Sequence, residues 1–336
     1  MVSRMTKTEL GRGERVIPGL WRLRLPLPWP VVPHGNAYAI AAGDGLVLVD
    51  CGTNLEGSFE ALTLALTQVD LSLKDVHTLV ITHAHSDHWG QARTILDKTG
   101  AELWLNPNLA HARSAYGDPE QALQHHFEIG IQSGVPEAPL REFLEQHRGM
   151  PSGVDALLEP EHELVNGVSI PSDLGDLHVY ETPGHAPSHV SLFNAEQRLL
   201  ISGDTLLGRV SPYFDFGFSP DPLGEFLGSM DTLEALDARL CVSGHGRPFT
   251  DVRAHIDANR ELLSQRLDAA RAGLNHEPQT ALELIPAVFS EPLTPGTATW
   301  RLPETLSYLT HLKRLGEASR APDPASSASR WIAAQP

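Results

Sequence analysis

The chain of 336 residues carries 42 acidic and 25 basic side chains, a formal charge of -17, and 41% of its residues are hydrophobic. This length and apolar content suffice for a folded core, while the negative charge disfavours nucleic acids and anionic membrane surfaces as partners. Two cysteines, Cys51 and Cys241, exclude a disulfide framework and a multi-cysteine zinc site. They indicate a reducing compartment, and we expect both to be buried as small apolar side chains.

The polar N-terminal segment is followed by an apolar stretch, IPGLWRLRLPLPWPVVP, which Arg22, Arg24 and several prolines interrupt. Neither a signal-peptide core nor a membrane span fits this pattern, so we expect a cytoplasmic protein without membrane partners. We expect residues 1–14 to be disordered and the first domain to begin at residue 15.

Short runs rich in Val, Ile and Leu come next, and such runs are typical of buried β-strands. They cover residues 36–42, 46–50, 77–81, 101–105, 177–181, 189–194, 198–202 and 239–243. Helical patterns lie between several of them, at 55–69, 91–98 and 222–236. Because the tight turn AGDG joins the first pair and helices separate later ones, we predict an α/β fold whose sheets mix antiparallel and parallel strands.

Two regions depart from this alternation. Between residues 106 and 160, polar helical patterns are broken by prolines and contain no strand candidate, which predicts a helical cap inserted into a first domain of residues 15–250. Helical patterns return in residues 251–317, which we predict to form a second, mostly helical domain. Residues 318–336 are rich in Ala, Ser and Pro and are predicted to be disordered.

The stretch THAHSDHWG, residues 82–90, directly follows one strand candidate. It places His83, His85, Asp87 and His88 on the loop and first helical turn at the carboxyl end of that strand. Imidazole and carboxylate groups at this spacing can converge on one or two divalent ions. The stretch therefore predicts a metal site.

This stretch resembles the HxHxDH signature of the metallo-β-lactamase-fold hydrolase superfamily. Four further motifs match in the family's order, each at the end of a predicted strand: LVLVDCG, ETPGHAPSH, LISGDTLL and VSGHGRP. The resemblance covers about residues 15–250 and implies an αββα sandwich of two mixed sheets. The helical insertion and a C-terminal region that resembles a winged-helix domain are similar to a subgroup with β-lactamase-like endoribonuclease and glyoxalase II-like relatives.

Carried over residue by residue, the resemblance implies a dinuclear metal site. The first ion would bind His83, His85 and His185, the second would bind Asp87, His88 and His245, and Asp204 would bridge them. Asp50 and His189 are expected to support these ligands without binding metal. Zn(II) is the first choice for such ligands, and Fe or Mn also suit them. A water shared by the ions would lose a proton near neutral pH and become the nucleophile, and we expect Asp87 to be required for catalysis.

The motifs leave the scissile bond open. We favour a carboxylic ester, thioester or lactone bond of a small-molecule or thioester substrate, with cleavage of single-stranded RNA as the alternative. The net charge weighs against RNA, as do residues 252–320, in which eight basic and eight acidic side chains balance. Leu207 stands where quorum-sensing lactonases of the family carry Tyr, which weakens the lactone assignment. We expect the winged-helix-like unit to serve packing or homodimer formation.

The cap is expected to wall the substrate pocket. Candidate apolar contacts are Tyr116, Phe127, Tyr213, Phe214 and Phe216. The cap histidines are predicted to be surface residues, since the adjacent pair in this region would point about 100° apart on a helix and could not share one ion. They are His111, His125, His126 and His147.

Overall fold

The computed structural model describes residues 11–209, 211–291, 294–321 and 328–334. Most of the N-terminal segment that was predicted to be disordered, residues 1–10, lies outside the described residues, as do residues 322–327 and 335–336 of the tail. Among the described helices, none combines the length and hydropathy that a membrane span requires.

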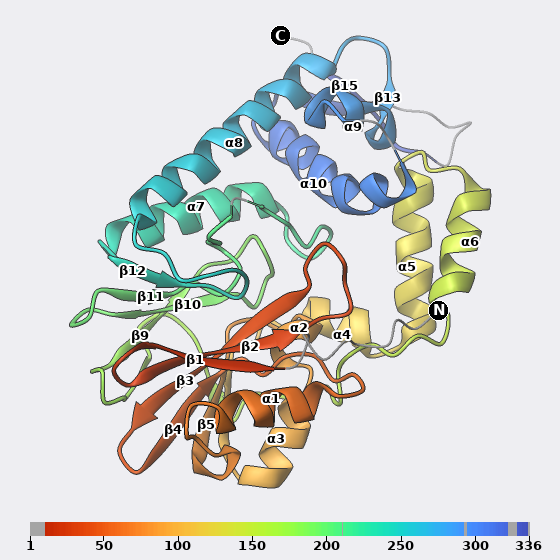
Figure 1. The fold of residues 1–336 in the computed structure, drawn as a ribbon. Coiled ribbons are helices and arrows are strands. Elements are labelled where there is room, and N and C mark those ends of the chain that lie inside the picture. The colour runs from red at the N-terminus through yellow and green to blue at the C-terminus, as the bar shows by residue number, and fades with distance from the viewer. Residues whose placement is uncertain (1–10, 210, 292–293, 322–327, 335–336) are drawn as a thin grey trace.

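The first of two mixed sheets has the strand order β1-β2-β3-β4-β5-β6-β7, and Figure 1 labels its strands β1 to β5. Its strands are β1 (Arg12–Ile17), β2 (Leu20–Pro26), β3 (His34–Ala42), β4 (Gly45–Val49), β5 (Val76–Ile81), β6 (Glu102–Leu105) and β7 (His162–Glu163). Strands β1 to β4 pair antiparallel, whereas β4 to β7 pair parallel. The predicted mixture of antiparallel and parallel strands is confirmed. Its cause is the length of the connections, since a short turn can join antiparallel strands, whereas parallel strands need a longer crossover.

The second sheet has the order β12-β11-β10-β9-β8. Its strands are β8 (Ser169–Ile170), β9 (Leu177–Glu181), β10 (Val190–Asn194), β11 (Leu199–Ile201) and β12 (Leu240–Val242). Only β11 and β12 pair parallel, and helix α7 (Pro222–Ala235) lies in the crossover between them. This sheet is therefore mixed as well.

The two sheets face each other, and helices cover both outer faces. Strand β3 illustrates the alternation: Tyr38 and Ile40 belong to the apolar cluster between the sheets, whereas Ala37 and Ala39 belong to the cluster under the first helical layer. That layer consists of α1 (Ser58–Thr67), the 3-10 turn Leu73–Asp75, α2 (Ser86–Trp89) and α3 (Ala92–Thr99). Helices α7 and α8 (Val252–Gly273) cover the second sheet (Figure 1).

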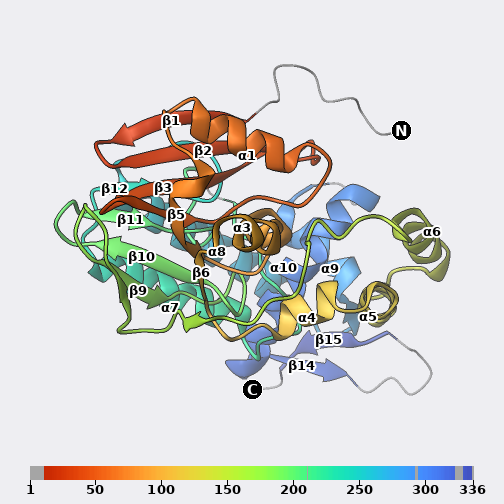
Figure 2. The ribbon, with the colours of Figure 1, turned by 90° about the horizontal axis from the view of Figure 1, so that it is seen from below.

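The predicted helical cap is present between β6 and β7. It contains α4 (Ala110–Tyr116), α5 (Pro119–Gln132) and α6 (Glu137–His147), and no strand lies in residues 106–160, all of which the structure describes. Both views place α5 and α6 to one side of the sheets, with α5 beside the C-terminal helices and strands (Figure 2). The backbone N–H of Leu282 donates to the Ser133 carbonyl at the end of α5, which fastens the cap to the C-terminal unit.

The C-terminal unit follows α8 and combines helices with a small sheet. It contains β13 (Gln279–Thr280), α9 (Ala281–Phe289), α10 (Pro295–Arg314), β14 (Ala318–Ala321) and β15 (Arg330–Ala333), with the strand order β13-β15-β14. The predicted disorder is thus wrong for residues 318–321 and 330–333, because Trp331 is buried in the core and holds β15 in place. It is also wrong for residues 12–14, which pair with β2.

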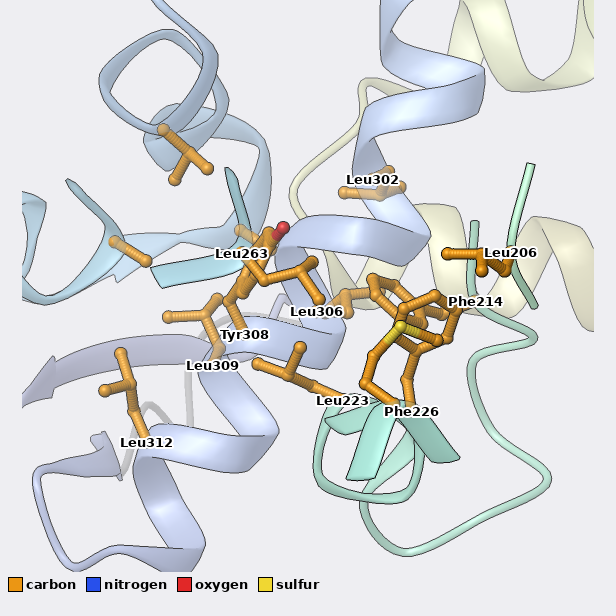
Figure 3. Packing of buried hydrophobic residues seen from close by; sticks show 14 of the residues in the cluster. Leu206, Phe214, Leu223, Phe226, Leu263, Leu302, Leu306, Tyr308, Leu309 and Leu312 are labelled. Carbon is orange, nitrogen blue, oxygen red and sulfur yellow. The ribbon is translucent and has the colours of Figure 1, made fainter. Parts of the chain in front are cut away.

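One apolar cluster joins the second sheet to the C-terminal unit. Phe193 and Leu200 come from the sheet, Phe226 comes from α7, and Leu306 and Leu309 come from α10. Figure 3 shows the side chains of α10 packed toward Phe214 and Phe226. The sheet and the C-terminal unit therefore share one core.

Candidate metal centre

The predicted ligands lie on four loops, each of which begins where a strand ends. They follow β5 (His83, His85, Asp87 and His88), β9 (His185), β11 (Asp204) and β12 (His245). The Val190 N–H donates to the Thr82 carbonyl at 2.8 Å, which ties β10 of the second sheet to the end of β5. The sheets therefore bring all four loops together at one edge.

The first group consists of His83, His85 and His185, whose ligand atoms lie within 4.8 Å of one another. His85 Nδ1 and His185 Nε2 are 3.1 Å apart. The other ring nitrogens face the protein: His185 Nδ1 lies 3.2 Å from the Tyr213 carbonyl, and His83 Nδ1 lies 3.1 Å from Thr82 Oγ1. Each imidazole thus turns one nitrogen inward and holds the other in a hydrogen bond.

The second group consists of Asp87, His88 and His245, again with ligand atoms within 4.8 Å. Asp204 lies between the groups: its Oδ2 is 3.1 Å from His245 Nε2 and 3.8 Å from His185 Nε2. Gly244 makes room for this carboxylate, since a Cβ atom at that position would lie 2.0 Å from Asp204 Oδ1. Asp204 thus lies in reach of both groups.

Three buried polar atoms in this cluster have no hydrogen-bond partner: His83 Nε2, His88 Nε2 and Asp204 Oδ1. Leaving such atoms buried and unpaired costs free energy, and native proteins rarely do so without a bound group. All three atoms face the space between the clustered side chains. Imidazole nitrogen and carboxylate oxygen are the ligand atoms that Zn(II) and related divalent ions bind. The residues therefore fit divalent cations.

Asp50 and His189 lie behind the cluster. The Asp50 carboxylate accepts a hydrogen bond from His88 Nδ1 at 2.8 Å and another from the Thr82 N–H at 2.8 Å. His189 Nε2 accepts from the Asp204 N–H at 2.9 Å, so its Nδ1 carries the proton and donates to Thr182 Oγ1. Both ring nitrogens of His189 are thus engaged with the protein, and the side chain orients the loop of Asp204.

Asp215 was missed from the sequence. Its Oδ2 accepts from His85 Nε2 at 2.8 Å, and its backbone N–H donates to the His185 carbonyl at 3.0 Å. It lies in the loop between β11 and α7, 130 residues after His85, and belongs to none of the recognised motifs. The only available signal was general: a metal-binding imidazole needs an acceptor for its second nitrogen.

The electrostatics of the cluster favour positive charge at its centre. Burial lowers the pKa of His245, but Asp204 and Asp87 outweigh burial and raise that pKa to about 10. Burial would raise the pKa of Asp87, yet His88 and His245 bring it down to about 2. The pKa of His185 falls to about 4 because burial disfavours its charged form. Two carboxylates thus attract cations, which is the requirement for a divalent ion.

Two of the five predicted pocket residues border the cluster. The ring of Tyr213 lies 6.2 Å from that of His85 and 5.7 Å from that of His185, and the Tyr116 hydroxyl accepts from the Ser86 N–H at 3.0 Å. Trp300 of α10, which was not predicted, lies 5.9 Å from the Tyr213 ring and is exposed.

The other three do not border the cluster. Phe214 is fully buried in the core against Phe226, and Phe216 packs against the same core. Phe127 lies on α5, under the guanidinium of Arg141 from α6. The loop between β11 and α7 holds Tyr213, which faces the site, and also Phe214 and Phe216, which face the core. The sequence alone does not distinguish these two orientations.

The predicted surface location holds for His126 and His147, whose rings are exposed. It is wrong for His111, which is 2% exposed, and His125 is half-buried. His111 packs behind the first group, with a ligand atom within 4.8 Å of those of His85 and Asp215. The reason is that α4 lies against the His185 loop, where His111 Nε2 is 3.3 Å from Ser188 Oγ.

A sequence model of the metallo-beta-lactamase superfamily matches residues 31–245. The chain belongs to this superfamily. It is 29% identical to the "Probable metallo-hydrolase YqjP" of Bacillus subtilis, over 81% of this chain and 86% of the relative. It is 23% identical to an "Atrochrysone carboxyl ACP thioesterase" of Claviceps purpurea, over 88% of this chain and 79% of that protein.

The fold agrees with that of a superfamily protein from Thermus thermophilus. That crystal structure matches with a TM-score of 0.78 and 28% sequence identity, and it covers 95% of this chain and 100% of its own. Because it covers 95% of this chain, the match extends well beyond residues 31–245 into the C-terminal unit. Superfamily membership together with the buried His/Asp clusters makes this chain a metallo-hydrolase.

Proposed function

We propose that this metallo-hydrolase cleaves a thioester or a related carboxylic ester, with a lactone as the least favoured of these bonds. The observation that carries the proposal is the inward orientation of the donors: two groups of ligand atoms, each within 4.8 Å, share Asp204 between them. We assign His83, His85 and His185 to one ion and Asp87, His88 and His245 to the other. Zn(II) is the ion that this donor set favours.

Two such ions would supply Lewis acidity and would activate water as a nucleophile near neutral pH. The protein's own contribution is positional. Asp50 and Asp215 hold His88 and His85 by their outer nitrogens, so the inner nitrogens keep their lone pairs directed to the centre. Asp87 and Asp204 carry the negative charge that offsets two divalent cations.

Three observations support a carboxylic substrate over RNA. One of the relatives that match most of this chain is named as a thioesterase. In addition, Tyr213 and Trp300 offer aromatic surface beside the first group, which suits an acyl chain or ring better than a ribose-phosphate backbone. The chain's charge of -17 opposes a polyanion along most of its surface.

Endoribonuclease activity remains the second candidate because of the C-terminal unit. The order helix, strand, helix, helix, strand, strand from α8 to β15 supports a winged-helix-like unit, a class of fold that often binds nucleic acid. We propose that it serves packing, since α10 buries Leu306 and Leu309 in the shared core. We further propose a homodimer in the cytoplasm, and the two free buried cysteines support a reducing location.

The test combines metal analysis with a substrate panel. We expect about two divalent ions per chain, turnover of thioesters that chelation abolishes, and recovery with Zn or Mn. Asp87→Ala and His185→Ala are expected to fold without activity, whereas His126→Ala, a change of an exposed cap histidine, retains activity. Full activity after complete removal of metal would disprove the mechanism, and discrete cleavage of several single-stranded RNAs without thioester turnover would favour the second candidate.

A further inference from the structure

Three arginines on one face of the first sheet lie next to a fourth in the loop of His245. Arg12 on β1 is the cross-strand partner of Arg24 on β2, and Arg22 lies two residues before Arg24 on the same face. The Arg22 guanidinium donates to the Gly246 carbonyl at 2.8 Å, which places Arg247 beside these strands. We refer to Arg12, Arg22, Arg24 and Arg247 as the arginine cluster.

The arginine cluster is poorly neutralised. Arg22 pairs with Glu14 at 3.0 Å, and this is the one ion pair that the four residues form with the described part of the chain. Arg24 donates instead to the ring of His34, at 2.8 and 2.9 Å. Burial and the nearby guanidinium groups of Arg22, Arg12 and Arg247 lower the pKa of Arg24, in agreement with an excess of positive charge. Such a concentration is unexpected in a chain of charge -17.

The cluster lies next to the metal centre. His34, whose ring contacts Arg24, accepts a hydrogen bond at its backbone carbonyl from His245 Nδ1 at 2.8 Å. Asn36 on the same strand donates to the carbonyls of Ser243 and Gly246, which fixes the His245 loop against β3. Arg24 is therefore two contacts away from a ligand of the second group.

The arginines and the aromatic residues flank different halves of the centre. Tyr213 lies against His85 and His185 of the first group, and Trp300 lies beyond it. The arginines lie on the side of His245, in the second group. A substrate that spans the centre would meet aromatic surface at one end and guanidinium groups at the other.

We propose that the arginine cluster binds phosphate on the thiol half of a thioester, with coenzyme A as the ligand class, while the acyl half contacts Tyr213 and Trp300. This inference rests on the proposed function and specifies its substrate. Guanidinium groups match phosphate oxygens with paired N–H donors, and the exposed side chains of Arg12 and Arg247 are able to reach a ligand in solution. A ligand with a single carboxylate would accept hydrogen bonds from only some of these guanidinium groups.

The test uses desulfo-coenzyme A, which carries the phosphates but has no thioester to cleave. Calorimetry on the metal-loaded full chain should give an affinity that falls about tenfold in Arg24→Gln and in Arg247→Gln. Arg15→Gln is the matched control, because Arg15 lies on β1 but pairs with Trp21 on the opposite face. The control should leave the affinity unchanged, and added salt should weaken binding to the unaltered protein.

Catalysis gives a second readout that compares two substrates in the same variant. The ratio of kcat/KM for acetyl-coenzyme A to that for acetyl-pantetheine, which lacks phosphate, should fall about tenfold in both arginine variants and not in Arg15→Gln. Equal affinity of all variants for desulfo-coenzyme A would overturn the inference, as would single-stranded RNA that displaces the probe and is cleaved. Arginine-dependent binding of the probe without hydrolysis of any thioester would instead overturn the proposed function and leave the phosphate site intact.

Discussion

Each metal-centre histidine has a defined outer hydrogen-bond partner. Three of these partners are backbone carbonyls or a hydroxyl group, whereas His85 and His88 donate to carboxylates, those of Asp215 and Asp50. A carboxylate on the outer nitrogen fixes the tautomer and raises the electron density on the inner nitrogen. The two aspartates therefore act on the two groups of the centre separately.

Replacement of Asp215 should weaken metal binding to the first group. Asp215→Ala removes the acceptor of His85 Nε2, and we expect metal affinity to fall about 10- to 100-fold at one of the two ions. Asp215→Asn should have a smaller effect, because its amide oxygen can still accept a hydrogen bond from His85 Nε2. The measurement is metal content after dialysis against a graded chelator, with Asp44→Ala, in an exposed turn, as the control. Retention of both ions by Asp215→Ala would contradict this role.

The shifted pKa values predict how metal binding depends on pH. In the metal-free protein the pKa of His245 is raised from 6.5 to about 10, so its proton stabilises the fold below pH 6.5 and this contribution is lost as the pH rises through about 10. A metal ion must displace this proton and those of His88 and His85, whose pKa values are also raised. Metal affinity should therefore increase with pH over that window, with release of roughly two to three protons per chain near neutral pH.

Competition titrations with a chromophoric chelator would measure this dependence, and calorimetry in buffers of different ionisation enthalpy would count the protons. His245→Gln should flatten the pH dependence, because it removes one of the competing protons. An affinity that stays constant across the window would show that these histidines are neutral in the metal-free protein.

At the level of the elements, patterns of local sequence predicted most of the fold. All eight strand candidates correspond to observed strands, because short runs of Val, Ile and Leu between turn residues are typical of buried β-strands. Strand β2 was missed although LWRLRL alternates, since Arg22 and Arg24 interrupted the apolar run. Their side chains share one face of the strand, opposite the buried Leu23 and Leu25. Strands of two residues, such as β7 and β13, are too short to show a period.

The limits of prediction at the site have a different cause. His83, His85, Asp87 and His88 could be recognised because one short turn holds all four. Asp215 and His111 reach His85 only through loops that are distant in sequence, so no local pattern marks them. Phe214 has the composition of a pocket residue, but it is buried because it packs against Phe226 of α7 and Tyr308 of α10.

At the scale of the whole molecule, the catalytic fold and the C-terminal unit depend on one core. Leu309 of α10 is fully buried in the cluster that also contains Phe226 of α7, and both are labelled in Figure 3. The same cluster contains Leu200 of the second sheet. The loop of Asp215 borders the same core, since Phe214 packs against Tyr308 of α10. Loss of packing in the C-terminal unit should therefore also destabilise the metal centre.

We accordingly expect a single cooperative unfolding transition for the full chain. Leu309→Ala should lower the free energy of unfolding by about 2–5 kcal/mol, because it leaves a cavity in a core that cannot fully collapse. Far-UV circular dichroism, tryptophan fluorescence and metal release should shift together to lower denaturant concentration. Leu315→Ala, one residue past α10 and exposed, should change the free energy by no more than about 0.5 kcal/mol. Two separate transitions, with metal retained through the first, would mean that the C-terminal unit folds independently of the metal centre.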